Sequence, residues 1–174
     1  MKGSAFTIEG STNVSSFQCY LTKTNFADTI AIERTWRHRT ITFDRLTLKY
    51  PVNEFDCQIE LMTEDLRSLL QSDRFPYLFL RVKTIEVIDG PQEIENLNVS
   101  SEVNVTIAGV TREVRVDKGS VVNHSESLLT FQGKVSLDMV DFGIEPPVKF
   151  FGMVKVDNLL EVSFSITMEV TDLK

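Results

Sequence analysis

The amino-acid sequence predicts an all-β fold, a single antiparallel β-barrel of about eight strands with one short helix. Apolar and polar side chains alternate strictly along residues 160–170, which is typical of a strand with one buried and one solvent-exposed face. The same period of two recurs at 55–61, 99–107 and 129–139. Strands that expose one face to solvent indicate antiparallel pairing, because parallel strands covered by helices are apolar throughout. We therefore expect one domain over residues 1–174.

The alternating segments, and the turn residues between them, define the expected strands. In chain order these strands lie at 5–9, 14–24, 40–52, 54–62, 77–88, 97–108, 111–117, 127–139 and 159–171. The alternation in the third segment slips halfway, so we expect a bulge or tight turn near Asp44 and Arg45. Gly109 predicts a short hairpin. Residues 25–39 predict a polar, basic loop, and 141–156 an irregular, Phe-rich crossing.

One convincing helix is expected at 63–72. Thr63 is a suitable N-cap, and the two acidic residues after it favour the positive end of the helix dipole. Pro76 prevents any continuation of the helix. An apolar side is formed by Leu66, Leu69 and Leu70. This side has the spacing to plug or cover one end of the barrel.

The composition excludes several classes of partner. The chain has 18 lysines and arginines against 25 aspartates and glutamates, and its net charge of -7 disfavours nucleic acid and anionic membrane surfaces. No stretch approaches the roughly 20 apolar residues of a membrane span, so an integral membrane protein is not expected. Strand-like residues begin at Phe6, which leaves no room for a signal peptide. Two expectations follow: a cytoplasmic protein, or a mature periplasmic or secreted chain.

Cys19 and Cys57 are the only cysteines, and neither belongs to a Cys-x-x-Cys pair. Two interpretations stay open. If the two residues face each other on paired strands, a disulfide would close a loop of about 40 residues and contribute roughly 4 kcal/mol. Otherwise they are two small buried apolar side chains.

The sequence holds little that could support catalysis. Its two histidines, His38 and His124, lie in polar, loop-like stretches, and neither is poised for proton transfer to a nucleophile. Two scattered histidines and two strand cysteines also lack the spacing of a zinc site. We therefore predict no catalytic residue and no metal, and we expect that the protein is not an enzyme.

Two features could carry a binding function. One is a set of aromatic and thioether side chains on apolar faces, which either fill the barrel or together line a pocket for a long apolar ligand. The other is the basic group of Arg34, Arg37, His38 and Arg39 around Trp36. This group could meet an anionic head group at the barrel mouth, or it is a solvated loop.

Five segments occur in an order that is hard to obtain by accident. They are Gly10–Val14 with Phe17 and Cys19, Phe55–Cys57, Asp65–Leu70 with Phe75 and Pro76, Thr106–Val114, and Asp138–Ile144. Together they resemble the YceI-like sequences, in which a strand, a Gly-Val-Thr turn and a second strand precede a penultimate strand that ends in Asp-Phe-Gly. The resemblance covers the chain from about Phe6 to Val170.

This resemblance implies a single YceI-like domain, a lipocalin-like antiparallel barrel that holds polyisoprenoid or other amphiphilic chains in its apolar interior. Such proteins are usually exported to the bacterial periplasm or cell surface. Val140 stands where many members carry an arginine, so a ligand contact by that basic residue is not expected. The apolar wall positions carried over from matching strands are Phe17, Leu21, Val105, Ile107, Phe131, Val135, Phe142, Phe164 and Ile166.

The predicted function is non-catalytic binding or transport of a long-chain amphiphile, a polyisoprenoid or related lipid. The expected partner is thus a hydrophobic small molecule, and no cofactor is expected other than a bound lipid. The alternative is a barrel filled by its own side chains, which would serve as a structural or stress-related interaction module without a ligand. A homodimer stays open as a further association.

Overall fold

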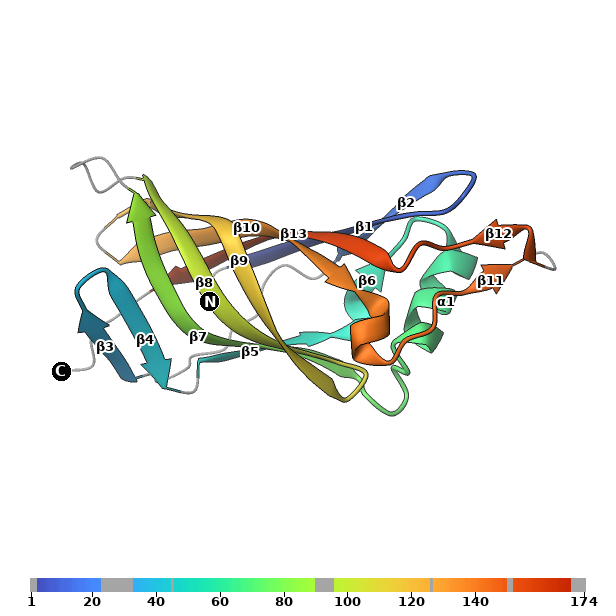
Figure 1. The fold of residues 1–174 in the computed structure, drawn as a ribbon, viewed down its shortest axis with the longest axis horizontal. Helices are drawn as coiled ribbons and strands as arrows, with labels where there is room; N and C mark the ends of the chain where they lie inside the picture. Colours follow the sequence, from blue (N-terminus) through green and yellow to red (C-terminus); the bar gives the residue numbers. More distant parts are fainter. Residues whose placement is uncertain are drawn as a thin grey trace.

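A curved antiparallel sheet makes up most of the molecule, with the α-helix and a small hairpin at one end (Figure 1). The computed structural model describes residues 3–22, 33–44, 46–89, 96–125, 127–149 and 152–169. The alternation of apolar and polar residues produces this sheet. In the first strand every second residue from Ser4 to Gly10 is buried, as a period of two requires.

The elements are named here with their bounds. The strands are β1 (Gly3–Ser11), β2 (Ser16–Leu21), β3 (Glu33–Arg37), β4 (Thr40–Asp44), β5 (Thr47–Pro51), β6 (Phe55–Asp56), β7 (Tyr77–Asp89), β8 (Asn96–Ile107), β9 (Val110–Asn123), β10 (Leu128–Asp138), β11 (Val148–Lys149), β12 (Val154–Lys155) and β13 (Leu159–Glu169). The α-helix is α1 (Glu60–Leu69), and two short 3-10 helices are η1 (Val52–Glu54) and η2 (Met139–Phe142).

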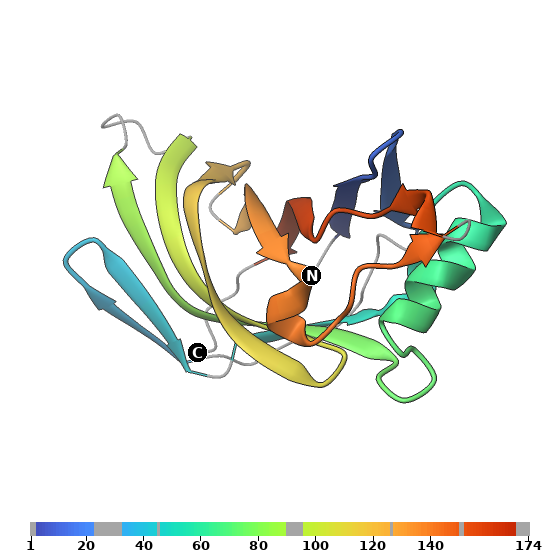
Figure 2. The same cartoon turned by 45° about the vertical axis from the view of Figure 1, so that its right-hand side comes forward.

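The strand order brings the first and the last strand together. Within the described residues, the main sheet runs β3-β4-β7-β8-β9-β10-β13-β1-β2-β6, and β5 pairs with β7 beside this path. β13 lies between β10 and β1, with Gly3 of β1 opposite Thr167. Strands β11 and β12 form a separate hairpin. Figure 2 shows the curvature of the sheet, with the β3–β4 hairpin at one end and α1 at the other.

Residues 47–56, which we call the strap, join the two sides of the curved sheet. The strap begins as β5 on the edge of β7 and ends as β6 on the edge of β2. Between these strands, the amide of Val52 donates to the carbonyl of Pro76 at 2.9 Å, and the amide of Thr22 donates to that of Glu54 at 2.7 Å. One continuous segment therefore connects opposite sides of the wall.

The all-β antiparallel class with one short helix is confirmed. Two details of the predicted barrel are wrong. The main sheet has 11 strands rather than about eight, and it is not closed by strand pairing, because β3 and β6 remain at the two ends of the order. One additional strand is β3, which lies in the segment predicted as a polar loop, and the predicted strand at 40–52 is divided into β4 and β5.

The predicted strand at 40–52 is interrupted near the expected bulge or tight turn, since β4 ends at Asp44 and β5 begins at Thr47. Arg45 itself lies outside the described residues. Part of the predicted basic loop at 25–39 forms β3 and the start of a tight hairpin, whose turn contains His38 with a φ of 56°. Residues 25–32 of that loop also lie outside the described residues.

The helix begins earlier than predicted. It starts at Glu60, and Thr63 lies inside it rather than capping it. The hydroxyl of Thr63 accepts a hydrogen bond from the amide of Cys57 at 2.9 Å and donates to Asp56 at 3.3 Å. Thr63 therefore fastens the turn before the helix. The apolar side is confirmed, since Leu70 is buried and Leu66 and Leu69 pack against the core.

The strand predicted at 54–62 is wrong beyond its first residues. Phe55 and Cys57 are buried, whereas Ile59 and Leu61 are 59% and 67% exposed. The chain turns at Gln58, which has a φ of 65°, so the later members of the alternating pattern no longer face the core.

Two smaller differences concern the second half of the chain. β9 continues through the predicted turn at 118–120 as one strand. The crossing predicted at 141–156 contains the end of η2 and the β11–β12 hairpin. Phe150 and Phe151, at the tip of that hairpin in the sequence, lie outside the described residues.

Candidate functional site: the inner wall of the curved sheet

Cross-strand pairs along β1, β13 and β10 build a continuous apolar wall. Residues opposite each other in a sheet share one face. Phe164 of β13 lies opposite Phe6 of β1 and Gly133 of β10. The next pairs join Ile8 to Val162, which in turn lies opposite Val135. Further strands add to the same buried cluster through Leu48, Val82, Val99, Val103 and Val105.

Aromatic rings gather at the centre of this wall. The ring of Phe6 meets that of Tyr50 edge-on, with 4.6 Å between the centroids. The ring of Phe164 lies 6.3 Å from Phe6 and 5.1 Å from Phe131. An added side chain at Gly133 would come within 2.9 Å of Phe164, so the glycine makes room for this ring. The cluster therefore fills part of the space that the sheet encloses.

The wall is not completely covered. In β13 the inward side chains of Leu160, Val162, Phe164 and Met168 are each half-buried, although all pack against the core cluster. A fully filled barrel would bury these side chains. Their remaining exposure means that apolar surface on the inner side of the sheet stays accessible to solvent.

Two polar groups lie within this apolar surface. The hydroxyl of Tyr50, a residue that is 1% exposed, lies 3.3 Å from the hydroxyl of Ser4 in a hydrogen bond. Burial raises the pKa of Tyr50 to about 12, against a smaller lowering by the bond to Ser4. The hydroxyl of Ser101, on β8, is buried without a hydrogen-bond partner among the described residues.

The predicted wall residues divide into three groups. Leu21, Val105, Phe131, Phe142 and Ile166 are buried members of the core cluster. The structure places Phe17, Ile107 and Phe164 half-buried against that cluster. Val135 is half-buried and lines a small pocket between β9 and β10. The structure thus brings these residues to one inner surface, and their contact with a ligand stays a prediction.

Sequence analysis missed part of the wall. Phe6, Ile8, Leu48 and Tyr50 contribute large buried surfaces but were not singled out as wall residues. The alternation of the sequence contained this signal. It places Phe6 and Ile8 on the same face as the buried Gly10, and Leu48 and Tyr50 on the same face as the buried Leu46.

The two cysteines form a disulfide, which decides between the two interpretations left open by the sequence. Cys19 of β2 is bonded to Cys57, 38 positions later, and the two residues are 0% and 4% exposed. Cys57 lies between the strap and α1. The bond therefore ties the chain before α1 to the edge strand β2.

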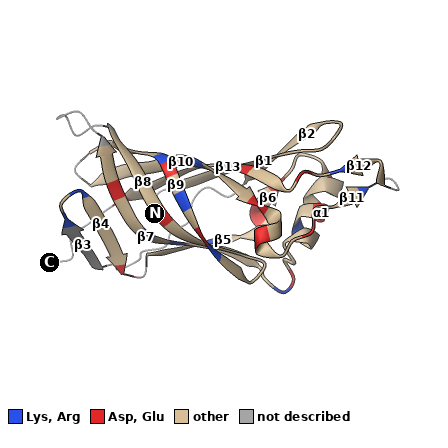
Figure 3. Cartoon of the chain, viewed as in Figure 1, with Lys and Arg blue, Asp and Glu red and all other residues tan. Residues whose placement is uncertain are grey.

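Positions of lysine and arginine are interspersed with positions of aspartate and glutamate along the strands and around α1 (Figure 3). Lys83 donates to Glu113 at 2.5 Å, and Arg115 donates to Asp117 at 2.7 Å. These exposed pairs contribute little to stability. Arg37 is exposed at the tip of the β3–β4 hairpin. Arg39 donates to the carbonyl of Ile88 at 3.2 Å. The side chains of Arg34 and Trp36 lie outside the described ones, so a head-group contact of this basic group stays a prediction.

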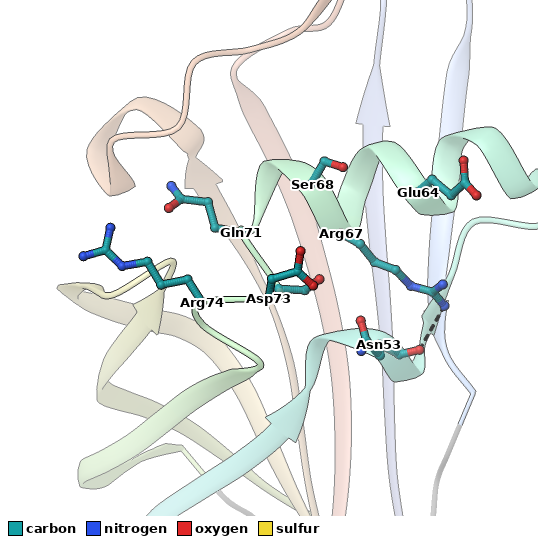
Figure 4. Close-up of a pocket in the computed structure, with 8 residues that line it drawn as sticks. Asn53, Glu64, Arg67, Ser68, Gln71, Asp73 and Arg74 are labelled. Carbon is teal, nitrogen blue, oxygen red and sulfur yellow. Dashed lines mark hydrogen bonds between the residues drawn. The ribbon is translucent and has the colours of Figure 1, made fainter.

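A polar pocket of about 650 Å³ lies on the outer side of α1, next to η1 (Figure 4). Arg67 of the helix donates to the carbonyl of Asn53 at 3.0 Å. Glu64 and Asp73 also line the pocket, so charges of both signs surround it. Its lining is polar and its side chains point in different directions in Figure 4. The pocket is therefore unsuited to an apolar chain.

Neither a membrane-spanning helix nor a metal-binding cluster occurs in the described part of the chain. No helix there is long and apolar enough to cross a bilayer. No three histidine, cysteine, aspartate or glutamate side chains there are grouped so that they could hold a metal ion.

Comparison with solved structures gives several similar folds. A polyisoprenoid binding domain from Saccharophagus degradans, implicated in plant cell wall breakdown, matches with a TM-score of 0.66 and 12% identity, over 97% of this chain and 94% of that chain. BcnA of Burkholderia cenocepacia matches with a TM-score of 0.59 and 13% identity, over 94% and 95%. The YceI protein of Campylobacter jejuni matches with a TM-score of 0.60 and 13% identity, over 87% and 86%. Identities this low show a shared fold.

Sequence comparison identifies the family. No curated protein matches the chain. A family model described as a YceI-like domain, however, matches residues 3–168, which is nearly the whole chain. The match agrees with the curved antiparallel sheet, its single helix and its apolar inner wall. The protein therefore belongs to the YceI-like domain family.

Proposed function

We propose that this protein binds a long-chain amphiphile, a polyisoprenoid or a related lipid, and performs no chemistry on it. The observation that carries this proposal is the partly exposed inner face of β13, where Leu160, Val162, Phe164 and Met168 remain accessible. A similar fold in Saccharophagus degradans is a polyisoprenoid binding domain, which supports the same class of ligand here.

The affinity would come from burial of apolar surface. Each buried methylene group contributes about 0.8 kcal/mol, so a few isoprene units are sufficient for micromolar binding after the cost of association is subtracted. Aromatic side chains adapt to a flexible chain because they offer broad apolar faces without a fixed hydrogen-bonding pattern. Selectivity would then depend on the length and shape of the tail.

The alternative is a ligand-free structural or interaction module. The close rings of Phe6, Tyr50, Phe131 and Phe164 favour it, because they occupy the centre of the enclosed space. Organic extraction of the purified protein followed by mass spectrometry separates the two functions. The lipid-binding protein releases a long-chain compound in stoichiometric amount, whereas the filled module releases none and takes up none.

A titration with retinol, a fluorescent isoprenoid alcohol, tests the wall directly. Val162→Phe adds a larger side chain to the inner wall. We expect the affinity of this variant for retinol to fall about tenfold, because overpacking removes space that the isoprenoid tail would occupy. Ser163→Phe adds the same ring to the outer face of the same strand and serves as the control. Equal affinities of the two variants would contradict binding at the inner wall.

We also propose that the protein works in an oxidising compartment, the periplasm or the cell exterior, and carries its ligand between membranes there. The buried Cys19–Cys57 disulfide supports this location, since such bonds persist where thiols are not kept reduced. Trapping free thiols in intact cells with an alkylating reagent tests it. Two alkylated cysteines in the trapped protein would contradict the proposal, and transfer of retinol between two vesicle populations tests the carrier role.

A further inference from the structure

The sheet is split between β9 and β10. These two strands pair only from Gly119 to Asn123 on β9 and from Leu129 to Gly133 on β10. Beyond Gly119 and Gly133, β9 continues on β8 and β10 continues on β13, without pairing to each other among the described residues. The two strands diverge in both Figure 1 and Figure 2. We call the gap between residues 110–118 and 134–138 the slit.

A pocket of about 250 Å³ occupies the slit. Its apolar lining comes from Val114 of β9, Val135 and Leu137 of β10, and Phe142 of η2. Phe142 belongs to the buried core cluster, and Val114 and Leu137 pack against it. Val135 lies opposite the half-buried Val162. Apolar surface therefore continues from the slit to the exposed part of the inner wall.

Most charged side chains at the rim of the slit have a partner. Arg115 is paired with Asp117, and Glu113 with Lys83. Asp138 accepts hydrogen bonds from the amide of Val140 and the side chain of Asn158. These contacts leave Arg112 and Asp141, which have no ion-pair partner in the described part of the chain.

Taken together, the slit lining contains two arginines and three carboxylates. A negatively charged head group would face more carboxylates than guanidinium groups. An uncharged hydroxyl or amide would suit this rim better, because it could accept a hydrogen bond from Arg112 and donate one to Asp141.

Resting on the proposed lipid binding, we propose that the ligand passes sideways through the β9–β10 slit and that its uncharged polar end stays there. The tail then extends along Val162 toward Phe164. The slit is thus the route of uptake and also the subsite that selects alcohols or amides over carboxylates and phosphates.

Blocking the slit tests the route. Val135→Cys is alkylated with a bulky, polar maleimide, and the rate of retinol uptake is measured by stopped-flow fluorescence before and after alkylation. We expect uptake to slow about tenfold or more, since the label obstructs the slit. The control is Val140→Cys with the same label, because Val140 is 58% exposed on η2 and does not line the pocket. The native disulfide is buried and leaves only the introduced thiol to react.

Equal uptake rates in the two labelled variants would overturn the route through the slit. Absence of retinol uptake by the unmodified protein would instead overturn the proposed lipid binding. Circular dichroism of the labelled proteins excludes unfolding as the cause of a slower rate.

A second comparison, which needs no label, tests the head-group class. Retinol and retinoic acid share one isoprenoid chain and differ in the polar end. We expect retinoic acid to bind about fivefold more weakly at neutral pH, because of repulsion at the rim. Asp141→Asn should narrow this ratio, whereas Asp73→Asn, in the pocket beside α1, should leave it unchanged. Equal or tighter binding of retinoic acid by the unmodified protein would overturn the head-group assignment.

Discussion

At the scale of single residues, two glycines separate the effect of backbone conformation from that of side-chain contact. Gly109 and Gly143 have φ values of 79° and 70°, in the region that strains other residues. An added side chain at Gly109 would lie 2.6 Å from the ring of Phe75, whereas at Gly143 it would meet nothing within 4 Å. The β8–β9 hairpin thus depends on glycine for two reasons, and the end of η2 for one.

We expect Gly143→Ala to lower the free energy of unfolding by about 1 kcal/mol, through backbone strain alone. Gly109→Ala should cost about 2 to 3 kcal/mol, because the ring of Phe75 must also move. Urea unfolding of both variants measures the difference. Equal losses would mean that Phe75 shifts at no cost.

The buried Tyr50 predicts a loss of stability at alkaline pH. Its pKa is raised from 10.0 to about 12, so between these values the unfolded chain loses the phenol proton while the folded protein keeps it. The free energy of unfolding should therefore fall by roughly 2 to 3 kcal/mol as the pH rises from 10 toward 12. Stability below pH 10 is not affected by this group.

Tyr50→Phe should abolish that part of the alkaline loss and cost about 1 kcal/mol at neutral pH, since the hydrogen bond to Ser4 is lost. Ser4→Ala removes the same bond but keeps the phenol, so its alkaline loss should persist. Denaturant unfolding between neutral pH and pH 12 measures both. An equal alkaline loss of stability in the Tyr50→Phe variant would mean that other titrating groups cause this loss.

At the scale of elements, the long strands could be predicted from the sequence and the short elements could not. Alternation with a period of two is local, so it identified β8, β10 and β13 within a few residues. It failed at Ile59 and Leu61, where the pattern continues although the chain has already turned at Gln58. The deciding contacts there are hydrogen bonds to Asp56 and Thr63, which a hydrophobic pattern does not contain.

These bonds give a prediction for the start of α1. Thr63→Val keeps the shape of the side chain but leaves the amide of Cys57 without its acceptor, so we expect a loss of about 1 to 3 kcal/mol. Thr63→Ser keeps the hydroxyl and should lose less than half as much. Thermal or urea unfolding compares the two. Equal losses would assign the effect to the methyl group.

At the scale of the whole molecule, the sequence predicted an apolar inner wall but neither the strap that joins its two sides nor the slit between β9 and β10. The pairing of the strap with β2 joins residues about 35 positions apart, and nothing in the alternation of Phe55 indicates its partner Leu21. Likewise β9 keeps its alternating valines where it leaves β10, so the divergence is invisible in sequence. Both features depend on sheet curvature, which is a property of the assembled strands.

The disulfide should contribute to global stability. Because it closes a segment of 38 positions, its loss should lower the free energy of unfolding by about 4 kcal/mol in the chain-entropy account. Urea unfolding of the protein with and without reductant measures this loss. Cys19→Ala with Cys57→Ala should be less stable by a similar amount and should not respond to reductant. A response of that double variant would show that the reductant acts elsewhere.

The strap fixes the width of the curved sheet at one end only, the end near α1. Near α1, residues 47–56 and the disulfide between Cys19 and Cys57 connect opposite sides of the sheet. At the opposite end, β3 pairs with β4 alone among the described strands, so no comparable connection joins the two sides of the sheet there. Under the proposed lipid binding, a tail too long for the interior would therefore project at the β3–β4 end, and the protein would tolerate longer ligands rather than exclude them.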